Sequence, residues 1–239
     1  MVHTLPGNKA DETYRIWLGG AVDDPTAEVV LVTDADNQFA PLREVYAALR
    51  REMAVRPLVL VGVGYGGGYE SPINRRMRDY TPSTMPDEPG TGGAAAFLTW
   101  VNGTLRPWLA ARGYRAGGWG VAGHSLGSLW GLYAFFEDTA GFDACLASAP
   151  SIWFDDRMLL GLVAQHRASD AHRSGRLVLS VGEGDSPSMT GDLALLEAQL
   201  AAEPFAGLDV TSQRFAGYDH YNVLPAAFRA GLQALYPAG

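Results

Sequence analysis

Cysteine and long apolar runs are both scarce in this chain. Its single cysteine, Cys145, has no partner for an internal disulfide and lies in an apolar run, ACLASA, that predicts a buried strand. The first residues show neither the basic nor the apolar segment of a secretory signal, and no later run is long enough to span a membrane. We therefore expect a cytoplasmic protein that does not insert into a membrane.

Positive charge is also in short supply. The 18 lysine and arginine residues are outnumbered by 26 acidic residues, and the net charge is −8. Such a chain repels nucleic acid and anionic membrane surfaces, so we expect neither as a partner. There is no HExxH motif and no cluster of cysteine and histidine, so we expect no metal and no other cofactor. A small-molecule substrate fits these limits better.

Short β-rich runs alternate with longer amphipathic runs, a pattern typical of a mainly parallel sheet with helices on both faces. With no internal repeat and no flexible linker, the pattern predicts one α/β domain over residues 1–239. We expect strands at 14–18, 28–33, 57–63, 119–123, 144–149, 176–182 and 209–215. We expect helices at 38–51, 93–112, 126–138, 155–169, 188–202 and 222–235.

The connections between these elements differ in length. Residues 64–92 contain no convincing helix or strand, whereas connections in compact domains usually span a few residues. This long segment leaves the carboxyl end of a strand, where α/β proteins place their sites, so we expect it to border the functional site. Between the strands at 144–149 and 176–182 there is room for about one helix. We therefore expect no large lid domain.

A serine flanked by glycines lies where an apolar strand ends and a helix begins. In GHSLG (123–127) the small residues allow the tight strand-to-helix turn that presents a serine hydroxyl above the sheet in α/β-hydrolases. The motif alone is weak, because a chain with 29 glycines can contain it by chance. As a nucleophile elbow, it predicts that Ser125 is the nucleophile of a serine hydrolase.

A serine nucleophile needs a histidine to accept its proton, and the chain offers five. His220 follows the final strand in the turn-rich sequence AGYDHYN, in agreement with the chain order serine, acid, histidine. We expect His220 to be the general base; the alternative is a hydrogen bond in a surface turn. The other four histidines fit this order less well. His3 lies in the terminal segment, His124 lies beside the serine, and His166 and His172 come before the last two strands.

The acid that orients the histidine is expected after the next-to-last strand. In VGEGD, Asp185 lies further out than Glu183, so we expect Asp185 to contact the histidine, with Glu183 as the alternative acid. Asp155 and Asp156 follow the preceding strand, where some hydrolases place the acid. Each of these carboxylates taken alone is equally compatible with a solvated charge or a helix cap.

Two backbone amides are needed to stabilise the oxyanion of a tetrahedral intermediate. One is expected at Leu126, which follows the nucleophile at a helix N-terminus. The other is expected in TDADNQF, after the strand at 28–33, at Ala35 or Asp36.

Six segments that are spread over most of the chain follow one another in this order: RRMRDYTP (75–82), GGAAAFLTWVNGTLRPWL (92–109), GHSLGSLWGLYAFF (123–136), SAPSIWF (148–154), VGEGD and YDH. Together they resemble the "putative esterase" branch of α/β-hydrolases, which includes the siderophore trilactone esterases acting on enterobactin and salmochelin. The resemblance implies an α/β-hydrolase fold, ester hydrolysis, and catalytic roles for Ser125 and His220. Two departures are visible: Ala35 in TDAD stands where the family often has the glycine of LDG, and Asp185 stands where relatives commonly have glutamate.

Possible substrate contacts lie in two of these segments. Arg76 matches the R-x-R-D pattern of the family and belongs with Arg78 to a local basic cluster in the long segment. An arginine there is expected to bind an anionic or phenolic oxygen of the substrate, or else to pair with Asp79 or a backbone carbonyl. Trp153 and Phe154 are expected to form an aromatic wall for an aryl group, or else to pack in the core.

Together the residues predict a serine hydrolase of carboxylic esters that acts through an acyl-enzyme. The resemblance points to siderophore-type or other aryl and acyl esters. Acyltransferases, feruloyl esterases and thioesterases use the same fold, so these activities stay open as alternatives. A binding protein that kept the fold and lost the activity is a further alternative, against which the serine, the histidine and the candidate acid all count.

Overall fold

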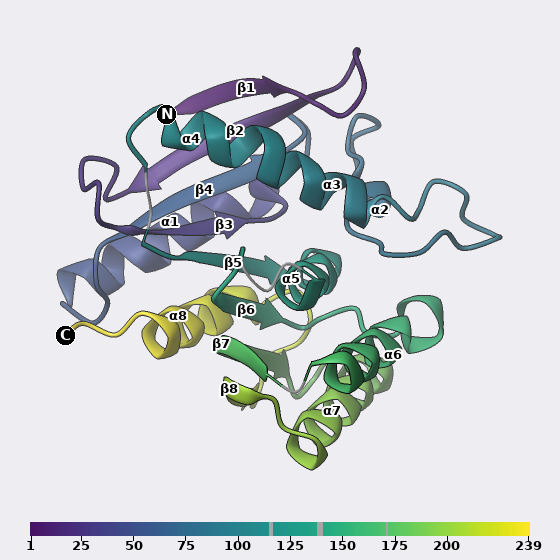
Figure 1. Cartoon of the computed structure of the whole chain (residues 1–239). Coiled ribbons are helices and arrows are strands. Elements are labelled where there is room, and N and C mark those ends of the chain that lie inside the picture. Colours follow the sequence, from purple (N-terminus) through teal and green to yellow (C-terminus); the bar gives the residue numbers. More distant parts are fainter. Residues whose placement is uncertain (115–116, 138–140, 171) are drawn as a thin grey trace.

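A twisted sheet runs through the molecule (Figure 1). The computed structural model describes residues 1–114, 117–137, 141–170 and 172–239, and within them eight strands form this sheet. The strands are β1 (Val2–Pro6), β2 (Thr13–Gly20), β3 (Glu28–Val32), β4 (Leu58–Gly64), β5 (Trp119–His124), β6 (Ala144–Ser148), β7 (His172–Gly182) and β8 (Ala206–Phe215). Their order is β1-β2-β4-β3-β5-β6-β7-β8. β1 and β2, and β2 and β4, pair antiparallel and the other neighbours pair parallel, which confirms the mainly parallel sheet.

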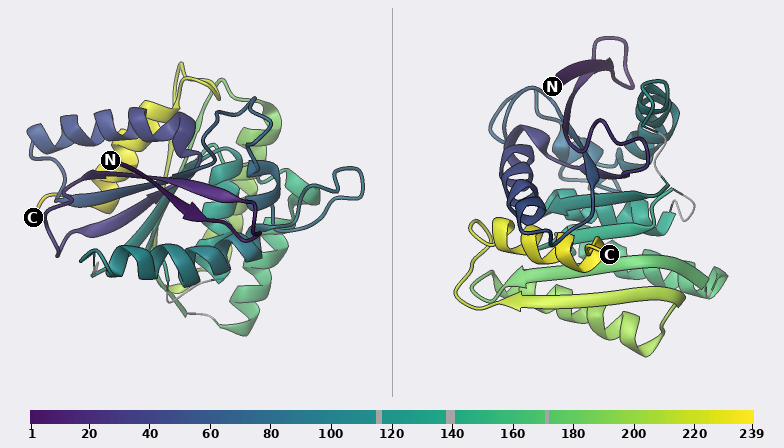
Figure 2. Two further views of the ribbon diagram at one scale, coloured as in Figure 1. Left: turned by 90° about the horizontal axis from the view of Figure 1, so that it is seen from above. Right: turned by 90° about the vertical axis from the view of Figure 1, so that its left-hand side faces the viewer.

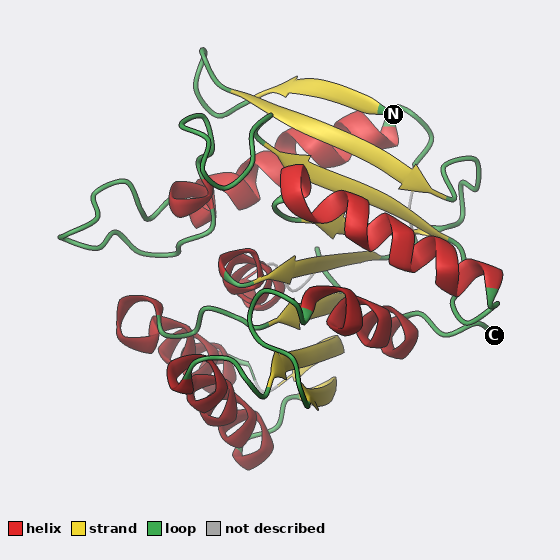
Figure 3. Ribbon diagram, turned by 180° about the vertical axis from the view of Figure 1, so that it is seen from behind, coloured by secondary structure: helices red, strands yellow, loops and turns green. Residues whose placement is uncertain are grey.

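Helices cover both faces of the sheet (Figures 1 and 3). They are α1 (Ala35–Arg51), α2 (Arg76–Asp79), α3 (Ala94–Trp100), α4 (Arg106–Ala110), α5 (Leu126–Glu137), α6 (Phe154–Ser169), α7 (Pro187–Ala202) and α8 (Leu224–Leu235). On one face α1 packs against β2 and β4, and α8 packs against β6 and β7. On the other face α5 packs against β5 and β6, and α7 against β7. This is the α/β-hydrolase fold that the sequence predicted, without a large lid domain among the described residues.

The apolar core has one part on each face of the sheet. Phe39 of α1 and Phe228 of α8 are buried on one side, and Trp130 and Phe135 of α5 on the other. Helix α5 is buried on nearly all sides, which explains why its sequence is apolar around the whole helix. The parallel strands point their carboxyl ends to one edge of the sheet, so the loops that follow β3, β5, β6, β7 and β8 can meet there.

The N-terminal residues form a strand that the sequence did not predict. β1 pairs with β2 from Val2 opposite Trp17 to Pro6 opposite Thr13, so the terminal segment that contains His3 is part of the sheet. Among the five residues of β1, the buried one is Leu5. A short edge strand with mostly exposed side chains leaves little periodic signal in a sequence.

The helix predicted at 93–112 is interrupted. α3 and α4 are joined by a π-helical turn, Val101–Leu105. Pro107, in the first turn of α4, has no N–H to donate to the carbonyl of Gly103. The wider π-helical turn accommodates the missing hydrogen bond.

The remaining differences concern connections and element ends. The long segment 64–92 contains the short helix α2, and its part between α2 and α3 projects from the body of the molecule (Figure 1; Figure 2, left view). The helix predicted at 126–138 ends at Glu137, and Asp138 lies outside the described residues. Within the described ranges, no helix is long and apolar enough to cross a membrane.

Candidate active site

Ser125 lies in a tight turn between β5 and α5. Its backbone is left-handed, with a φ of 58°, and its amide donates to the carbonyl of Ser148 at 2.9 Å. A Cβ at position 123 would lie 2.6 Å from the backbone of Gly127, and a Cβ at position 127 would lie 2.3 Å from Thr33. Both glycines of the motif are therefore required by close contacts. The strained turn presents the serine hydroxyl at the carboxyl edge of the sheet.

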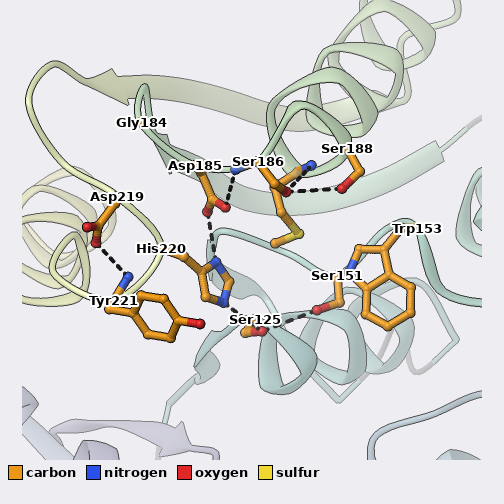
Figure 4. A pocket seen from close by; sticks show the side chains of 11 residues that line it. Ser125, Ser151, Trp153, Gly184, Asp185, Ser186, Ser188, Asp219, His220 and Tyr221 are labelled. Carbon is orange, nitrogen blue, oxygen red and sulfur yellow. Dashed lines mark hydrogen bonds and ion pairs between the residues drawn. The ribbon is translucent and has the colours of Figure 1, made fainter.

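A series of hydrogen bonds joins Ser125, His220 and Asp185 (Figure 4). Ser125 Oγ lies 3.1 Å from His220 Nε2, and His220 Nδ1 lies 2.8 Å from Asp185 Oδ2. The Asp185 side chain is 3% exposed, and its Oδ1 accepts the amide of Ser186 at 2.7 Å. A carboxylate on Nδ1 favours the Nδ1–H tautomer, which leaves Nε2 able to accept the serine proton. The structure thus brings together the three residues predicted as a triad.

Two loops hold the imidazole and the carboxylate in place. The loop after β7, which carries Asp185, is joined to the loop after β8 by a hydrogen bond from the Gly184 amide to the Tyr218 carbonyl at 2.8 Å. In the loop after β8, the Asp219 carboxylate accepts the amide of Tyr221 at 2.9 Å. His220 lies between these two residues, so its backbone is fixed on both sides.

The other candidate acids are placed elsewhere. Glu183 is exposed, and its amide donates to the carbonyl of Phe215 at 3.0 Å. Asp155 accepts a hydrogen bond from the Ser83 hydroxyl. The Asp156 side chain is 99% exposed. Of the carboxylates that the sequence left open, it is Asp185 that contacts His220.

His124 packs against the ring of His220. The ring centroids lie 4.7 Å apart, and His124 Nδ1 lies 3.0 Å from Ser148 Oγ. Burial, together with the nearby His220, lowers the pKa of His124 to about 3, and a hydrogen bond to the His220 backbone opposes this shift. His124 is therefore neutral near pH 7 and supports the loop of His220. His3 packs against Trp108, His166 lies near Glu137, and His172 begins β7.

The expected oxyanion donors lie at the N-termini of two helices. Leu126 is the first residue of α5, and Ala35 is the first residue of α1, which follows β3, the neighbour of β5. The Asp36 carboxylate accepts the amides of Tyr65 at 2.6 Å and Gly66 at 2.9 Å, which ties the start of α1 to the end of β4. The amides of Ala35 and Asp36 both lie in the first turn of α1, so both stay candidates for the second donor.

Arg76 is fixed by a buried carboxylate that was not predicted. Its Nε and Nη2 each lie 2.9 Å from an oxygen of Asp34, a residue 2% exposed at the start of α1. Burial raises the pKa of Asp34, and the charge of Arg76 opposes the rise. The Arg76 guanidinium also lies 4.8 Å from the ring centre of Tyr69. The available signal was an acid directly after a buried strand, in TDAD.

The other predicted substrate residues divide into two groups. Trp153 is 45% exposed and lines a cavity beside Ser125. Phe154 is 1% exposed and packs in the core, so the expected aromatic wall does not extend to it. Arg78 lies 2.7 Å from Asp79 and also pairs with Glu12. The pairing with Asp79 is the alternative to substrate binding that the sequence left open. Arg78 is not among the described residues that line the two cavities at the triad.

Two cavities meet at the triad, one of about 440 Å³ and one of about 510 Å³. Ser125, His220 and Tyr221 line both of them. Tyr221 is 91% exposed, and no motif in the sequence singles it out. An ester bond placed at Ser125 therefore has space on both sides. Further lining residues are Ser151, Trp153 and Met189 in the smaller cavity, drawn in Figure 4, and Gln38, Tyr69, Arg76 and Leu224 in the larger one.

Comparisons with known proteins agree with this architecture. A family model described as "Putative esterase" matches residues 23–226. A siderophore enterobactin esterase of Emericella nidulans is 30% identical over 178 residues, which cover 64% of this chain and 58% of that protein. The ferri-bacillibactin esterase BesA of Bacillus subtilis is 26% identical over an alignment of 263 residues, which covers 100% of this chain and 90% of that protein. This chain thus spans little more than half of the Emericella protein but most of the Bacillus one.

A solved structure shares the fold. The BES protein from Bacillus cereus superimposes with a TM-score of 0.87 at 23% identity, over 98% of this chain and 94% of that one. At this level of identity the likeness establishes the arrangement of strands and helices, and the chemistry has to be argued from the site itself.

Proposed function

The chain belongs to the "Putative esterase" family, and on this basis we propose that it is a serine hydrolase of carboxylic esters that works through an acyl-enzyme. The observation that carries the proposal is the series of hydrogen bonds from Asp185 through His220 to Ser125 at a strand-to-helix elbow. Sequence relatives named as siderophore esterases support the same reaction class.

In the proposed mechanism, Ser125 Oγ attacks the ester carbonyl carbon while its proton moves to His220 Nε2. Asp185 accepts the Nδ1–H bond and stabilises the imidazolium that forms. The tetrahedral intermediate then collapses, and the leaving alcohol takes the proton from Nε2. A water molecule repeats the sequence on the acyl-enzyme, with Ser125 Oγ as the leaving group.

The oxyanion of each tetrahedral intermediate is assigned to the amides of Leu126 and Ala35. Both lie at helix N-termini, where unpaired amides and the helix dipole favour negative charge. Leu126 follows the nucleophile directly, so its amide lies near the attacked carbonyl in this class of fold. The amide of Asp36, the next residue of α1, is the alternative to that of Ala35.

We assign the substrate to the siderophore-type esters, or to other esters with an aryl or acyl group of similar size. Trp153 and Tyr221 offer exposed aromatic surface at the smaller cavity. In the larger cavity, Arg76 and Tyr69 present a cation and a phenol to the ligand. A guanidinium beside an aromatic ring suits a phenolic or anionic oxygen.

The first test removes the nucleophile. Ser125→Ala should lower kcat on p-nitrophenyl butyrate by about 10⁴-fold or more, because the acyl-enzyme can no longer form. A fluorophosphonate probe should label the wild-type protein and leave this variant unlabelled. Ser169→Ala removes an exposed hydroxyl at the end of α6, outside both cavities, and should retain turnover within about twofold. Near-wild-type turnover in Ser125→Ala would overturn the mechanism.

The second test addresses the substrate. A panel of ferric and iron-free catecholate trilactones, feruloyl esters and short p-nitrophenyl esters separates the candidate classes by kcat/KM. Failure on every catecholate ester would remove the siderophore assignment and leave the esterase proposal standing. Ester product formed from an added alcohol would indicate acyl transfer in place of hydrolysis.

This proposal includes three further expectations. They are a single domain over residues 1–239, no nucleic-acid or membrane partner, and a cytoplasmic location. The continuous sheet supports the single domain, and the net charge of −8 supports the expected lack of nucleic-acid binding. Cell fractionation tests the location directly.

A further inference from the structure

The hydroxyl of Ser125 has a second partner besides His220. Ser125 Oγ lies 3.1 Å from His220 Nε2 and 3.3 Å from the hydroxyl oxygen of Ser151 (Figure 4). Ser151 is 2% exposed, yet it lines the smaller cavity beside the nucleophile. The sequence marked its segment, SAPSIWF, without giving this serine a role.

The direction of the Ser125–Ser151 bond follows from counting protons. His220 Nδ1 faces the Asp185 carboxylate, which can only accept, so Nδ1 carries the hydrogen and Nε2 is the acceptor. The single hydrogen of Ser125 is then used on Nε2. The hydrogen between the two hydroxyls must come from Ser151, so Ser151 donates to Ser125 Oγ.

The backbone around Ser151 is built to hold the hydroxyl at this position. The Ser151 amide donates to the carbonyl of Ser125 at 3.2 Å, so the two serines are joined by both backbone and side chain. Ala149, directly after β6, has a left-handed φ of 42°, and its amide donates to the carbonyl of Ser180 at 2.7 Å. A left-handed alanine is costly, and strain of this kind concentrates at functional sites. The buried Ile152 then anchors the segment in the core.

We propose that Ser151 is a further catalytic residue, which stabilises negative charge on Ser125 Oγ when the acyl-enzyme breaks down; this inference rests on the proposed ester hydrolysis. In that step the bond between the acyl carbon and Oγ breaks and its electron pair goes to Oγ. The proton on His220 Nε2 passes to Oγ as it leaves. The Ser151 hydroxyl donates to the same oxygen throughout and gives up no proton itself.

The hydrogen bond from Ser151 should accelerate acylation and deacylation to different extents. In the free enzyme Ser151 already donates to a neutral hydroxyl, so part of the stabilisation is present before acylation. In the acyl-enzyme Oγ is an ester oxygen and a poor acceptor, so the bond strengthens only as charge develops. An interaction that is stronger in the transition state than in the ground state accelerates the step. We therefore expect deacylation to depend on Ser151 more than acylation does.

The experiment is burst-phase kinetics on p-nitrophenyl butyrate with Ser151→Ala, Ser151→Thr and Ser169→Ala. Ser151→Ala should lower the deacylation rate constant by about 10- to 100-fold, as expected for one hydrogen bond to a charged oxygen, and lower acylation by less. Ser151→Thr keeps a hydroxyl and should recover most of the rate. Ser169→Ala removes an exposed hydroxyl at the end of α6, which lines neither cavity at the triad, and should leave both steps within about twofold.

The outcomes separate this inference from the function on which it rests. Deacylation within about twofold of wild type in Ser151→Ala, with Ser125→Ala inactive, would overturn the role of Ser151 alone. Equal losses in both steps that Ser151→Thr does not restore would indicate a packing role and overturn it as well. Undiminished turnover in Ser125→Ala would instead overturn the proposed hydrolysis itself.

Discussion

At the scale of single residues, Asp185 sets the tautomer of His220, because its Oδ2 lies 2.8 Å from Nδ1. Asp185→Asn keeps the shape of the side chain but can turn an N–H toward Nδ1, which moves the imidazole hydrogen to Nε2. We expect kcat/KM on p-nitrophenyl butyrate to fall by about 10³- to 10⁴-fold. Glu183→Gln, two residues away and exposed, should remain within about twofold of wild type. A greater loss of kcat/KM in Glu183→Gln than in Asp185→Asn would contradict the assignment of Asp185 as the acid.

His124 links the stability of the protein to pH. Its pKa is about 3 in the folded chain, whereas histidine in an unfolded chain titrates near 6.5. Between these values the unfolded state binds the proton and the folded state does not. The free energy of unfolding therefore falls as the pH falls through this window, by about 2 kcal/mol between pH 7 and pH 5.

His124→Gln removes this proton linkage and keeps a polar side chain near Ser148. We expect urea unfolding of the variant to lose about 2 kcal/mol less than wild type on going from pH 7 to pH 5. Parallel pH profiles for the two proteins would show that His124 is not the group responsible. Activity measured at pH 7 reports separately on how well the His220 loop is held.

Residues marked by local pattern were predictable, and those defined by contacts across the fold were not. Ser125 has flanking glycines, and His220 follows the final strand in the chain order of the fold. Asp34 gains its role from Arg76, which lies 42 residues away. Ser151 likewise depends on a hydroxyl 26 residues away. No periodicity or spacing in one sequence reveals such pairings.

At the scale of elements, the turn from β5 into α5 depends on close backbone contact. A Cβ at Gly123 would lie 2.6 Å from the backbone of Gly127, so Gly123→Ala must displace the turn that carries the nucleophile. We expect at least about a 100-fold loss of kcat/KM, since a displacement near 1 Å misplaces the reacting atoms. Gly191→Ala, an exposed position in α7 with open space around it, should instead stabilise the protein by about 0.5–1 kcal/mol.

Circular dichroism melts and ester hydrolysis distinguish these two glycines. Full activity in Gly123→Ala would mean that the turn tolerates a side chain and that the close contact is not required. A lowered melting temperature in Gly191→Ala would contradict the open surroundings at that position.

The sequence predicted elements well where burial on both faces makes a strand apolar along its whole length. The central strands β3, β4, β5 and β6 are apolar along their length, and each was placed to within one residue at either end. β1 was missed because its exposed side chains carry little signal. The π-helical turn Val101–Leu105 was missed because the sequence does not show how a helix adapts to Pro107. A proline inside a helical pattern is equally compatible with a continuous helix that is kinked.

At the scale of the whole molecule, the site is assembled from segments that lie far apart in the chain. Parallel pairing of β3, β5, β6, β7 and β8 places the loops that carry Ala35, Ser125, Ser151, Asp185 and His220 along one edge of the sheet. Any α/β chain with this strand order brings the same loops together. Hydrogen bonds and an ion pair fasten the long segment 64–92 to that edge.

The Asp34–Arg76 ion pair is one of these contacts. Arg76→Met leaves the Asp34 carboxylate buried without its counter-charge, and losing one partner of a buried pair costs about 3–5 kcal/mol. Adding Asp34→Asn to this variant removes the buried charge and should restore much of the lost free energy of unfolding. Arg229→Met breaks an exposed pair with Glu52 and should cost about 1 kcal/mol or less.

The loss in free energy of unfolding caused by Arg76→Met should depend on pH. Burial raises the pKa of Asp34 above that of an unfolded aspartate, so within the window between the two values the folded state binds more protons. Arg76→Met removes the opposing charge and extends the window upward, so its deficit relative to wild type should shrink as the pH falls from 8 to 5. Chemical denaturation at several pH values measures this. An Arg76→Met protein that unfolds with wild-type free energy, yet shows a raised KM on catecholate esters, would assign Arg76 to the substrate and not to the fold.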